Sequence, residues 1–278
     1  MSQLVKNITS IKYFLEKHDI VDPSYDINMN YHPSVPSKFT SNPTFVAEFN
    51  NCLINSLPVL ITEDRHMITE HLWPMLDRYK NKPKKHHGMW DSWGEEINIE
   101  MPPVTKQFDG TNKYVWLPID KHSTGNPWHI WIDVISKFRL IEKQWSTNFT
   151  KYIYILANPS PYFDKVAKEL FPKLKYYVMP EGETWRFEHL IAPSMSNCND
   201  GVVTPQLPPW LRHFKGSFGI SENKKPHRKI FVSRDKAHTR KLNNASELLM
   251  ALKGWESVVL EDLPIREQVN VFAEASHV

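Results

Sequence analysis

Apolar residues along the chain fall either into short continuous runs or into longer stretches spaced three or four residues apart. Runs of about four to eight apolar residues are typical of buried strands, and the wider spacing is typical of helices that bury one face. The predicted strands are Thr44–Phe49, Leu57–Thr62, Val115–Pro118, Tyr152–Leu156, Leu174–Met179, Thr184–Ala192, Ile230–Ser233 and Ser257–Leu260. Because strands and helices alternate, the pattern predicts an α/β fold with a largely parallel sheet.

The strongest helix signal opens at Gly125-Asn126-Pro127 and runs to about Gln144. Asn126 suits the N-cap, and Pro127 suits the first helical position. The apolar face predicted for this helix consists of Trp131, Val134, Ile135, Phe138 and Ile141. Other helices are predicted at Ile11–Lys17, at Met67–Tyr79, at Tyr162–Leu170 and from Leu211. Two more follow near the end of the chain. One begins at Asn244 and has Leu248, Leu249 and Leu252 on its apolar face, and the other begins at Pro264 with Ile265, Val269 and Phe272 facing inward.

Prolines and polar stretches divide the chain into three parts. Residues 1–42 form an irregular lead-in, and residues 43–204 form a first α/β domain. Residues 205–278 form a second domain with the order strand, helix, strand, helix, and a third apolar stretch begins at His277-Val278. This order is the first half of a nucleotide-binding α/β domain.

Composition narrows the classes of function. The chain has 278 residues, 41% of them hydrophobic and 23% charged, which is ordinary for a soluble protein of about two domains. A net charge of +3 gives no reason to expect a nucleic-acid partner, and the basic run Lys80–His87 is read as a solvated loop. Two cysteines make no disulfide framework. With no signal peptide and no long apolar run, we expect no transmembrane segment and a cytoplasmic location.

Two groups of polar residues are candidates for chemistry. His129 and Asp133 stand four residues apart and share a helix face, so they suit a general base and its orienting carboxylate. A local hydrogen bond that only steadies the helix is the alternative. Arg234 and Arg240 follow the strand Ile230–Ser233, where two guanidinium groups could neutralise a diphosphate, or could be ordinary surface arginines.

Carboxylates at strand ends are further candidates. Glu261 closes the strand Ser257–Leu260, where an acidic residue commonly accepts hydrogen bonds from a ribose. An exposed glutamate before a helix is the alternative. Glu181, Glu183 and Glu188 lie near strand ends in the first domain, and the pattern alone does not select one of them.

The segment Lys229-Ile-Phe-Val-Ser-Arg-Asp-Lys-Ala-His-Thr-Arg-Lys-Leu-Asn-Asn, followed by Val-Val-Leu-Glu-Asp-Leu and Glu-Gln-Val-Asn-Val-Phe-Ala-Glu-Ala, resembles glycosyltransferase family 61. Asn126-Pro-Trp-His-Ile-Trp-Ile-Asp is similar to the family's asparagine–histidine–tryptophan helix, and Phe187-Glu-His-Leu-Ile-Ala-Pro-Ser to its central strand. The resemblance covers roughly residues 44–278. The family includes capsular-polysaccharide transferases, plant xylosyl- and arabinosyltransferases, and protein O-linked GlcNAc transferases.

The resemblance implies a GT-B-like fold of two Rossmann-like domains, the second incomplete, and an inverting transferase. The donor would be a nucleotide-sugar, usually a UDP-sugar, the acceptor a glycan or glycoprotein, and no metal or other cofactor would be obligatory. It implies catalytic roles for His129 and Asp133. It implies substrate-binding roles for Arg234 and Arg240 at the diphosphate and for Glu261 near the nucleoside, with Asn126 and Glu188 as further substrate-binding candidates.

The family continues with a Pro-His-Gly-Ala-Gly-Leu loop, and Val278 falls just before the place of that loop. We therefore expect a fragment or a truncated product whose second domain is poorly stable alone. Two other functions stay open. One is a catalytically inactive remnant that acts as a binding module, and the other is a nucleic-acid binder that uses Lys80–Lys85.

Overall fold

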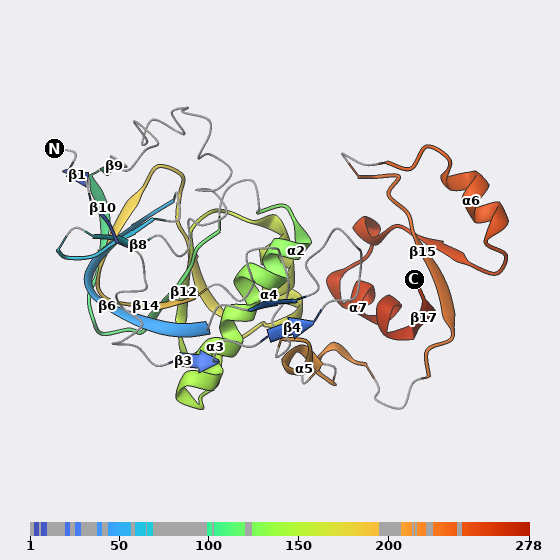
Figure 1. Ribbon diagram of the computed structural model, residues 1–278, viewed down its shortest axis with the longest axis horizontal. Coiled ribbons are helices and arrows are strands. Elements are labelled where there is room, and N and C mark those ends of the chain that lie inside the picture. Colours follow the sequence, from blue (N-terminus) through green and yellow to red (C-terminus); the bar gives the residue numbers. More distant parts are fainter. Residues whose placement is uncertain are drawn as a thin grey trace. The chain divides into compact units, whose positions relative to one another are not determined.

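The computed structural model describes residues 3–5, 7–9, 20–22, 26–28, 38–40, 44–56, 59–64, 66–68, 99–101, 103–119, 124–194, 207–212, 214, 216–220, 225–237 and 241–278. Contacts divide the chain into two compact units (Figure 1). The first comprises residues 1–163 and 173–207, and the second comprises residues 164–172 and 208–278.

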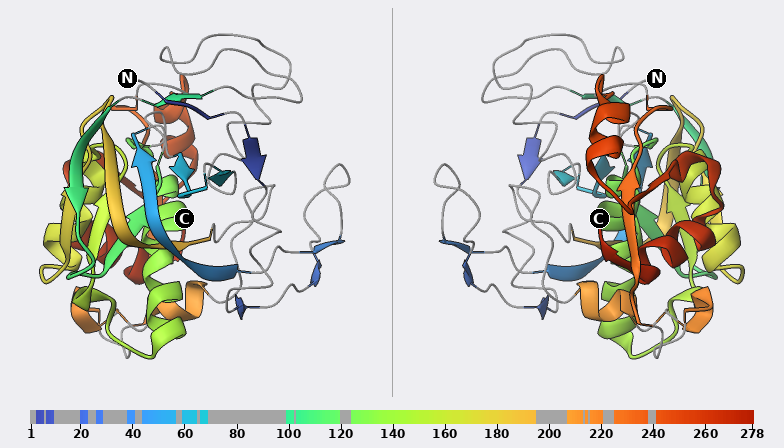
Figure 2. Two further views of the ribbon diagram at one scale, coloured as in Figure 1. Left: turned by 90° about the vertical axis from the view of Figure 1, so that its left-hand side faces the viewer. Right: turned by 90° about the vertical axis from the view of Figure 1, so that its right-hand side faces the viewer.

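The first unit is built on a mixed sheet of ten strands among the described residues. The order along its main path is β13 (Lys175–Val178), β12 (Ile153–Leu156), β11 (Tyr114–Leu117), β14 (Thr184–Pro193), β6 (Thr44–Asn55), β7 (Leu60–Ile61), β8 (His66–Ile68) and β2 (Asn7–Thr9). β10 (Val104–Phe108) also pairs with β14, and β3 (Ile20–Asp22) pairs with β6. Figure 2 (left) shows β10, β14 and β6 running side by side.

The strands that carry the helical crossovers are parallel. β11 pairs in parallel with both β12 and β14, and β12 pairs in parallel with β13. β6 closes this part of the sheet with a long antiparallel pairing to β14. Two small antiparallel pairs complete the described strands: β1 (Gln3–Val5) with β9 (Ile99–Met101), and β4 (Asp26–Asn28) with β5 (Lys38–Thr40).

One nearly continuous helix connects β11 to β12. It consists of α2 (Pro127–His129), the π-helical segment η4 (Ile130–Ile135) and α3 (Ser136–Trp145). The 3-10 turn η5 (Phe149–Lys151) follows, and α4 (Pro161–Leu170) begins the connection from β12 to β13. Phe138 on α3 stacks on Phe149 at 5.0 Å and meets the edge of Tyr154 on β12, so the helix is packed firmly on the sheet.

The second unit has a three-stranded parallel sheet in the order β16 (Glu256–Val258), β15 (Arg228–Val232), β17 (Ala275–His277). Helix α6 (Ala245–Ala251) joins β15 to β16, and the 3-10 turn η7 (Leu260–Asp262) and α7 (Ile265–Glu274) join β16 to β17. Figure 1 shows α6 and α7 on opposite sides of β15. α5 (Leu207–Arg212) and η6 (Gly216–Phe218) precede this sheet, and Trp210, Phe214, Phe218 and Phe171 form an aromatic cluster.

The predicted α/β class with a mostly parallel arrangement of strands is confirmed. The strand predictions hold with changed bounds: Thr44–Phe49 extends to Asn55, and among the described residues of Leu57–Thr62 the strand consists of Leu60–Ile61. The helix predicted from Met67 is wrong at its start, because Met67 and Ile68 pair in β8, and the rest of that range lies outside the described residues. The helix predicted at Ile11–Lys17 also lies outside them.

Leu248, on the apolar face predicted for α6, is 37% exposed, and α6 contains no buried residue, so this face is uncovered. On α7, one position predicted to face inward is wrong. Phe272 on α7 is 45% exposed, while Ile265 on the same helix is buried as predicted. Three- or four-residue spacing shows that apolar side chains share a helix face, but a second surface must lie on that face to bury it.

Candidate functional site

The carboxyl ends of the parallel strands in the first unit are tied together by side chains. Asn158, just after β12, is buried and donates hydrogen bonds to the carbonyl oxygens of Ile119 at 2.6 Å and Ser56 at 2.7 Å. Ser160 donates to the carbonyl oxygen of Thr124 at 2.5 Å. The loops that follow β11 and β12 therefore form one fixed edge. Ligands of open α/β sheets bind at this kind of edge, beyond the carboxyl ends of the strands.

His129 and Asp133 meet on the helix that begins at this edge. The Nδ1 atom of His129 lies 2.7 Å from Oδ2 of Asp133. The His129 side chain is 30% exposed and the Asp133 side chain 12%. One ring nitrogen is thus held by a nearly buried carboxylate, and the ring keeps some access to solvent. The contact agrees both with a general base and its orienting carboxylate and with a local hydrogen bond that steadies the helix, the two readings that the spacing predicted.

Asn126 fixes the start of the helix. Its backbone is extended, and its side-chain oxygen accepts a hydrogen bond from the amide of Trp128 at 3.0 Å. This is the N-cap that the sequence predicts, with Pro127 in the first turn. Trp128 carries a large indole that is 48% exposed beside His129. Trp128 was not among the residues predicted from the sequence, although an aromatic residue between a helix cap and a candidate base is a visible signal.

The π-helical segment changes which residues face the core. Ile130 is fully buried, whereas Trp131, predicted on the buried stripe, is only partly covered. Trp131 instead donates its indole N–H to the hydroxyl of Tyr162 at 3.3 Å. The rest of the predicted stripe, Val134 to Ile141, is buried as expected. An α-helical spacing rule places Trp131 on the wrong face because the π-helical turn contains an additional residue.

Two residues of the second unit face the carboxyl edge of its own sheet. In the strand order β16-β15-β17, the chain passes from β15 to β16 on one side and then crosses back to β17 on the other side of β15, so the switch point of the sheet lies between the carboxyl ends of β15 and β17. Arg234 follows β15 directly and is exposed. Glu261 lies in η7, one turn beyond β16, and is exposed as well. Arg240 lies outside the described residues.

The loops that carry Arg234 and Glu261 are linked. The ammonium group of Lys236 pairs with the Asp262 carboxylate, which joins the loop after β15 to the turn after β16. The amide of Asp235 donates to Ser233 Oγ at 3.2 Å, and the amide of Ala237 donates to the Arg234 carbonyl at 3.0 Å. The segment after β15 is therefore a compact turn, and Lys236 and Asp262 are neighbours that the sequence analysis missed.

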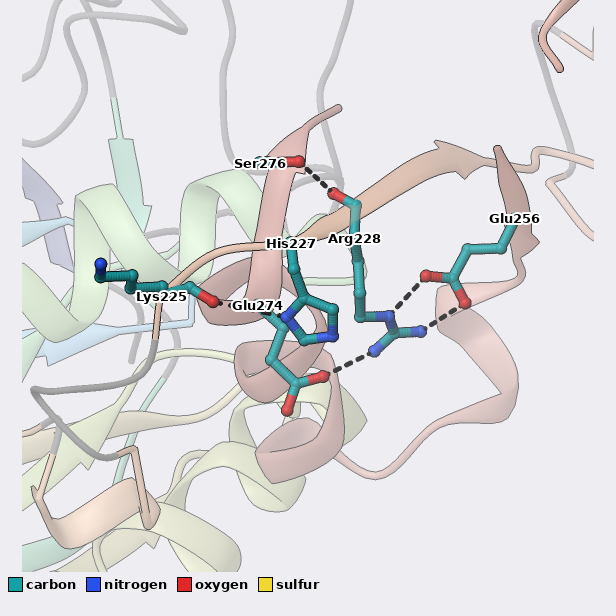
Figure 3. A network of polar contacts seen from close by, with 6 residues as sticks. All are labelled: Lys225, His227, Arg228, Glu256, Glu274 and Ser276. Atoms are coloured by element: carbon teal, nitrogen blue, oxygen red, sulfur yellow. Dashed lines mark hydrogen bonds and ion pairs between the residues drawn. The ribbon is translucent and has the colours of Figure 1, made fainter. Parts of the chain in front are cut away.

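The opposite edge of this sheet carries an ionic network (Figure 3). Arg228, at the start of β15, donates to Glu256 on β16 at 2.5 and 2.8 Å and to Glu274 on α7 at 3.0 Å. The hydrogen bonds from Arg228 lower the pKa of Glu256, and the bonds to Glu256 and Glu274 raise the pKa of Arg228. A cavity of about 530 Å³ between β16 and α7 is lined partly by this network. The ion pairs of Arg228 join the amino ends of β15 and β16 to the carboxyl end of α7.

Glu188 has a different partner from the other candidates. It lies exposed on β14, and its Oε2 accepts the amide hydrogen of Gly110 at 3.1 Å. His189, the next residue, makes a second imidazole–carboxylate contact, from Nε2 to Glu48 Oε2 at 2.7 Å. Within the first unit, His129 and Asp133 therefore contact each other, whereas Glu188 binds the loop at Gly110.

Within the described residues, His, Cys, Asp and Glu side chains form no group of three suited to a metal ion.

One family of known proteins covers the candidate residues of both units. The family model described as Glycosyltransferase 61 matches residues 65–278, which include both the His129–Asp133 pair and the turn at Arg234. This chain belongs to glycosyltransferase family 61. The resemblance seen in its motifs is confirmed, and membership supports a glycosyltransferase that uses a sugar donor and an acceptor. No curated protein matches the chain at a significant level.

The basic run Lys80–His87 lies outside the described residues. In the described part of the chain, no helix has both the length and the apolar character that a bilayer crossing requires. The cytoplasmic location stays a prediction.

Proposed function

We propose that this chain is an inverting glycosyltransferase that moves a sugar from a UDP-sugar to a hydroxyl group of a glycan or protein, with no obligatory metal. The observation that carries the proposal is the 2.7 Å contact between His129 and Asp133 at the carboxyl edge of a parallel sheet, in a member of family 61. We further propose a GT-B fold in which residues 43–204 are the acceptor domain and residues 205–278 are the nucleotide-sugar domain.

The reaction needs a base for the acceptor. With Nδ1 directed at Asp133, His129 takes the acceptor's hydroxyl proton on Nε2. The acceptor oxygen then forms a bond to the anomeric carbon as the bond from that carbon to the diphosphate oxygen breaks. The electron pair leaves with UDP, and attack opposite to the leaving group inverts the configuration. The Asp133 carboxylate orients the imidazole and stabilises the cation that forms.

The leaving diphosphate needs positive charge. We assign this role to Arg234 and Arg240, because a guanidinium group donates two hydrogen bonds in one plane to phosphate oxygens. The place of Arg234 at the switch point of the second sheet supports this assignment. Glu261 stands at the corresponding end of the neighbouring strand and suits the ribose hydroxyls. Asn126 and Glu188 remain proposed acceptor-side contacts.

The base assignment is tested by a matched pair of histidines. His129→Gln should lower the release of UDP from UDP-glucose, UDP-xylose or UDP-N-acetylglucosamine by about 10²- to 10⁴-fold, the usual contribution of a general base. His189→Gln is the control, because His189 makes an imidazole–carboxylate contact of the same 2.7 Å length and is similarly exposed. Equal activity of the two variants would exclude His129 as the base.

The donor assignment is tested by calorimetry with UDP. Arg234→Ala should weaken binding of UDP by about tenfold or more, since hydrogen bonds to charged groups contribute about 1.5–3 kcal/mol. Lys253→Ala removes an exposed cation of the same unit at the end of α6 and should leave the affinity unchanged. If the protein binds UDP but releases none from any donor, the chain is a binding module and the transferase proposal fails.

A further inference from the structure

The helix that carries His129 and Asp133 changes its winding in the middle. The six residues Ile130–Ile135 are π-helical, and the amide of Ser136 reaches back five residues to the carbonyl of Trp131. The Ser136 hydroxyl donates to the carbonyl of Ile132. Lys137 Nζ donates to the carbonyl of Asp133 at 2.6 Å. Two side chains from the first turn of α3 thus bind two successive carbonyl groups of the π-helical segment.

The additional residue in the segment rotates everything before it. One residue of an α-helix corresponds to about 100° of rotation, so the amino-terminal part of this helix is turned by roughly that angle relative to α3. The burial of Ile130 and the partial exposure of Trp131 agree with this rotation. His129 lies in the rotated part. The direction of its ring relative to the core therefore depends on whether the π-helical segment persists.

Lys137 is an unusual residue for its environment. Its side chain is fully buried, beside neighbours such as Phe138 and Leu140 that are equally buried. Taking an ammonium group out of water is costly, and an apolar side chain of similar volume is often as stable or more stable at such a position. From this buried position the ammonium group of Lys137 donates to the Asp133 carbonyl, so this contact with the π-helical segment is made away from solvent.

We propose that Ser136 and Lys137 are positioning residues that hold the π-helical segment and thereby set the direction of the His129–Asp133 pair. Neither residue touches the substrate in this proposal. The catalytic consequence rests on the proposed function, whereas the structural part does not.

The experiment compares Lys137→Met, Ser136→Ala and the double variant with the wild-type protein. Lys143→Met is the control, because Lys143 lies exposed on the same helix α3. The first measurement is the NMR signal of the Trp131 indole N–H, assigned with Trp131→Phe. The hydrogen bond from this group to Tyr162 reports the rotation of the segment. The second measurement is kcat for UDP release and KM for the donor.

In Lys137→Met we expect the Trp131 indole signal to shift and its exchange with water to accelerate. We expect kcat to fall by about 10- to 100-fold with KM for the donor unchanged, because small misplacements of a catalytic group have effects of this size. Ser136→Ala should show the same changes to a smaller extent, and the double variant the largest. Lys143→Met should show neither change.

An unmoved Trp131 signal in Lys137→Met and in the double variant would overturn the proposal, whatever the activity. A moved signal with unchanged kcat would also overturn it, because the segment would then not position the pair. If His129→Gln is fully active, the proposed function fails, and the indole signal still decides whether Ser136 and Lys137 hold the segment.

Discussion

The helix that follows β11 in the first unit and helix α6 in the second unit occupy equivalent places in two strand–helix–strand connections, yet their surroundings differ. From Ile132 to Ile141 every residue of the first helix is buried, including Asp133 and Lys137, whereas α6 buries none. Polar groups in the first helix are therefore held by a packed core. The candidate residues of the second unit, Arg234 and Glu261, stand exposed on turns.

The two units therefore hold their candidate residues in different ways. In the first unit, a packed core surrounds the helix that carries the His129–Asp133 pair and restricts the geometry of the pair. In the second unit the sheet is held by a few buried residues such as Ile230 and Ile265, and by ionic contacts at Arg228 and Lys236. Its candidate residues, which lie on exposed turns, have more conformational freedom.

The largest difference between the two units should be the rate at which a cysteine thiol reacts with a reagent in solution. Burial raises the pKa of Cys52 from its ordinary value of 9.0 to about 12, a difference of 12 − 9.0 = 3. In a Cys198→Ser background, the native protein should therefore react with Ellman's reagent about a thousandfold more slowly at Cys52 than the unfolded chain does. A cysteine introduced at Ser246, which is exposed on α6, should react at nearly the unfolded rate. Rapid labelling of native Cys52 would contradict the contrast.

Removal of one phenyl ring from each unit should show the next largest effect. Phe138→Ala removes a fully buried ring that contacts Phe149 and Tyr154, and should lower the free energy of unfolding by about 3–5 kcal/mol. Phe272→Ala removes a ring that is 45% exposed, and should cost less than about 1 kcal/mol. Urea unfolding of both variants measures the two costs. Equal costs would mean that α7 is covered in solution.

The ionic network of the second unit should have a smaller effect. Arg228→Met removes contacts to both Glu256 and Glu274, and should lower the free energy of unfolding by about 1 kcal/mol, because the pairs are partly exposed. Lys236→Met removes an ion pair whose two side chains are exposed by about half, and should have no measurable effect. Thermal unfolding of both variants measures the difference, and an equal loss in both would show that burial does not distinguish the two pairs.

The smallest effect should depend on pH. The pKa of Glu256 lies below its ordinary value of 4.5, so its contribution is present above pH 4.5 and is lost as the pH falls through the lowered pKa. The Tm of the wild-type protein should therefore exceed that of Glu256→Gln at neutral pH, and the two values should converge as the pH falls below the lowered pKa. A difference that persists or grows in acid would exclude the Arg228 contact as its cause.

Local sequence features predicted the candidate pair well. The spacing of His129 and Asp133 sufficed, because residues four apart meet on either an α-helical or a π-helical turn. The cap at Asn126 also followed from local chemistry. The π-helical segment could not be predicted in this way, since no residue type in Ile130–Ile135 marks it. The position of Trp131 was wrong for that reason.

The arrangement of strands followed the sequence less closely. Alternating apolar runs were enough to place β11, β12, β13 and β14 and to predict parallel pairing. They gave no indication that β6 would pair with β14 over nearly its whole length, since hydrogen bonds between distant segments leave no periodic signal. The contact between Glu188 and Gly110 and the contact between Lys236 and Asp262 depend on pairings of this long-range kind.

The sequence by itself determined the class of fold, the family and the chemical types available: an imidazole–carboxylate pair in one unit and arginines after a strand in the other. These depend on local spacing and on short motifs. Only the tertiary structure decided that Asp133 and Lys137 are buried, that Leu248 and Phe272 are not, and that the helix contains an additional residue in the π-helical turn that follows His129. Burial and helix phase depend on which distant surfaces pack against each residue, and those surfaces exist only in the folded chain.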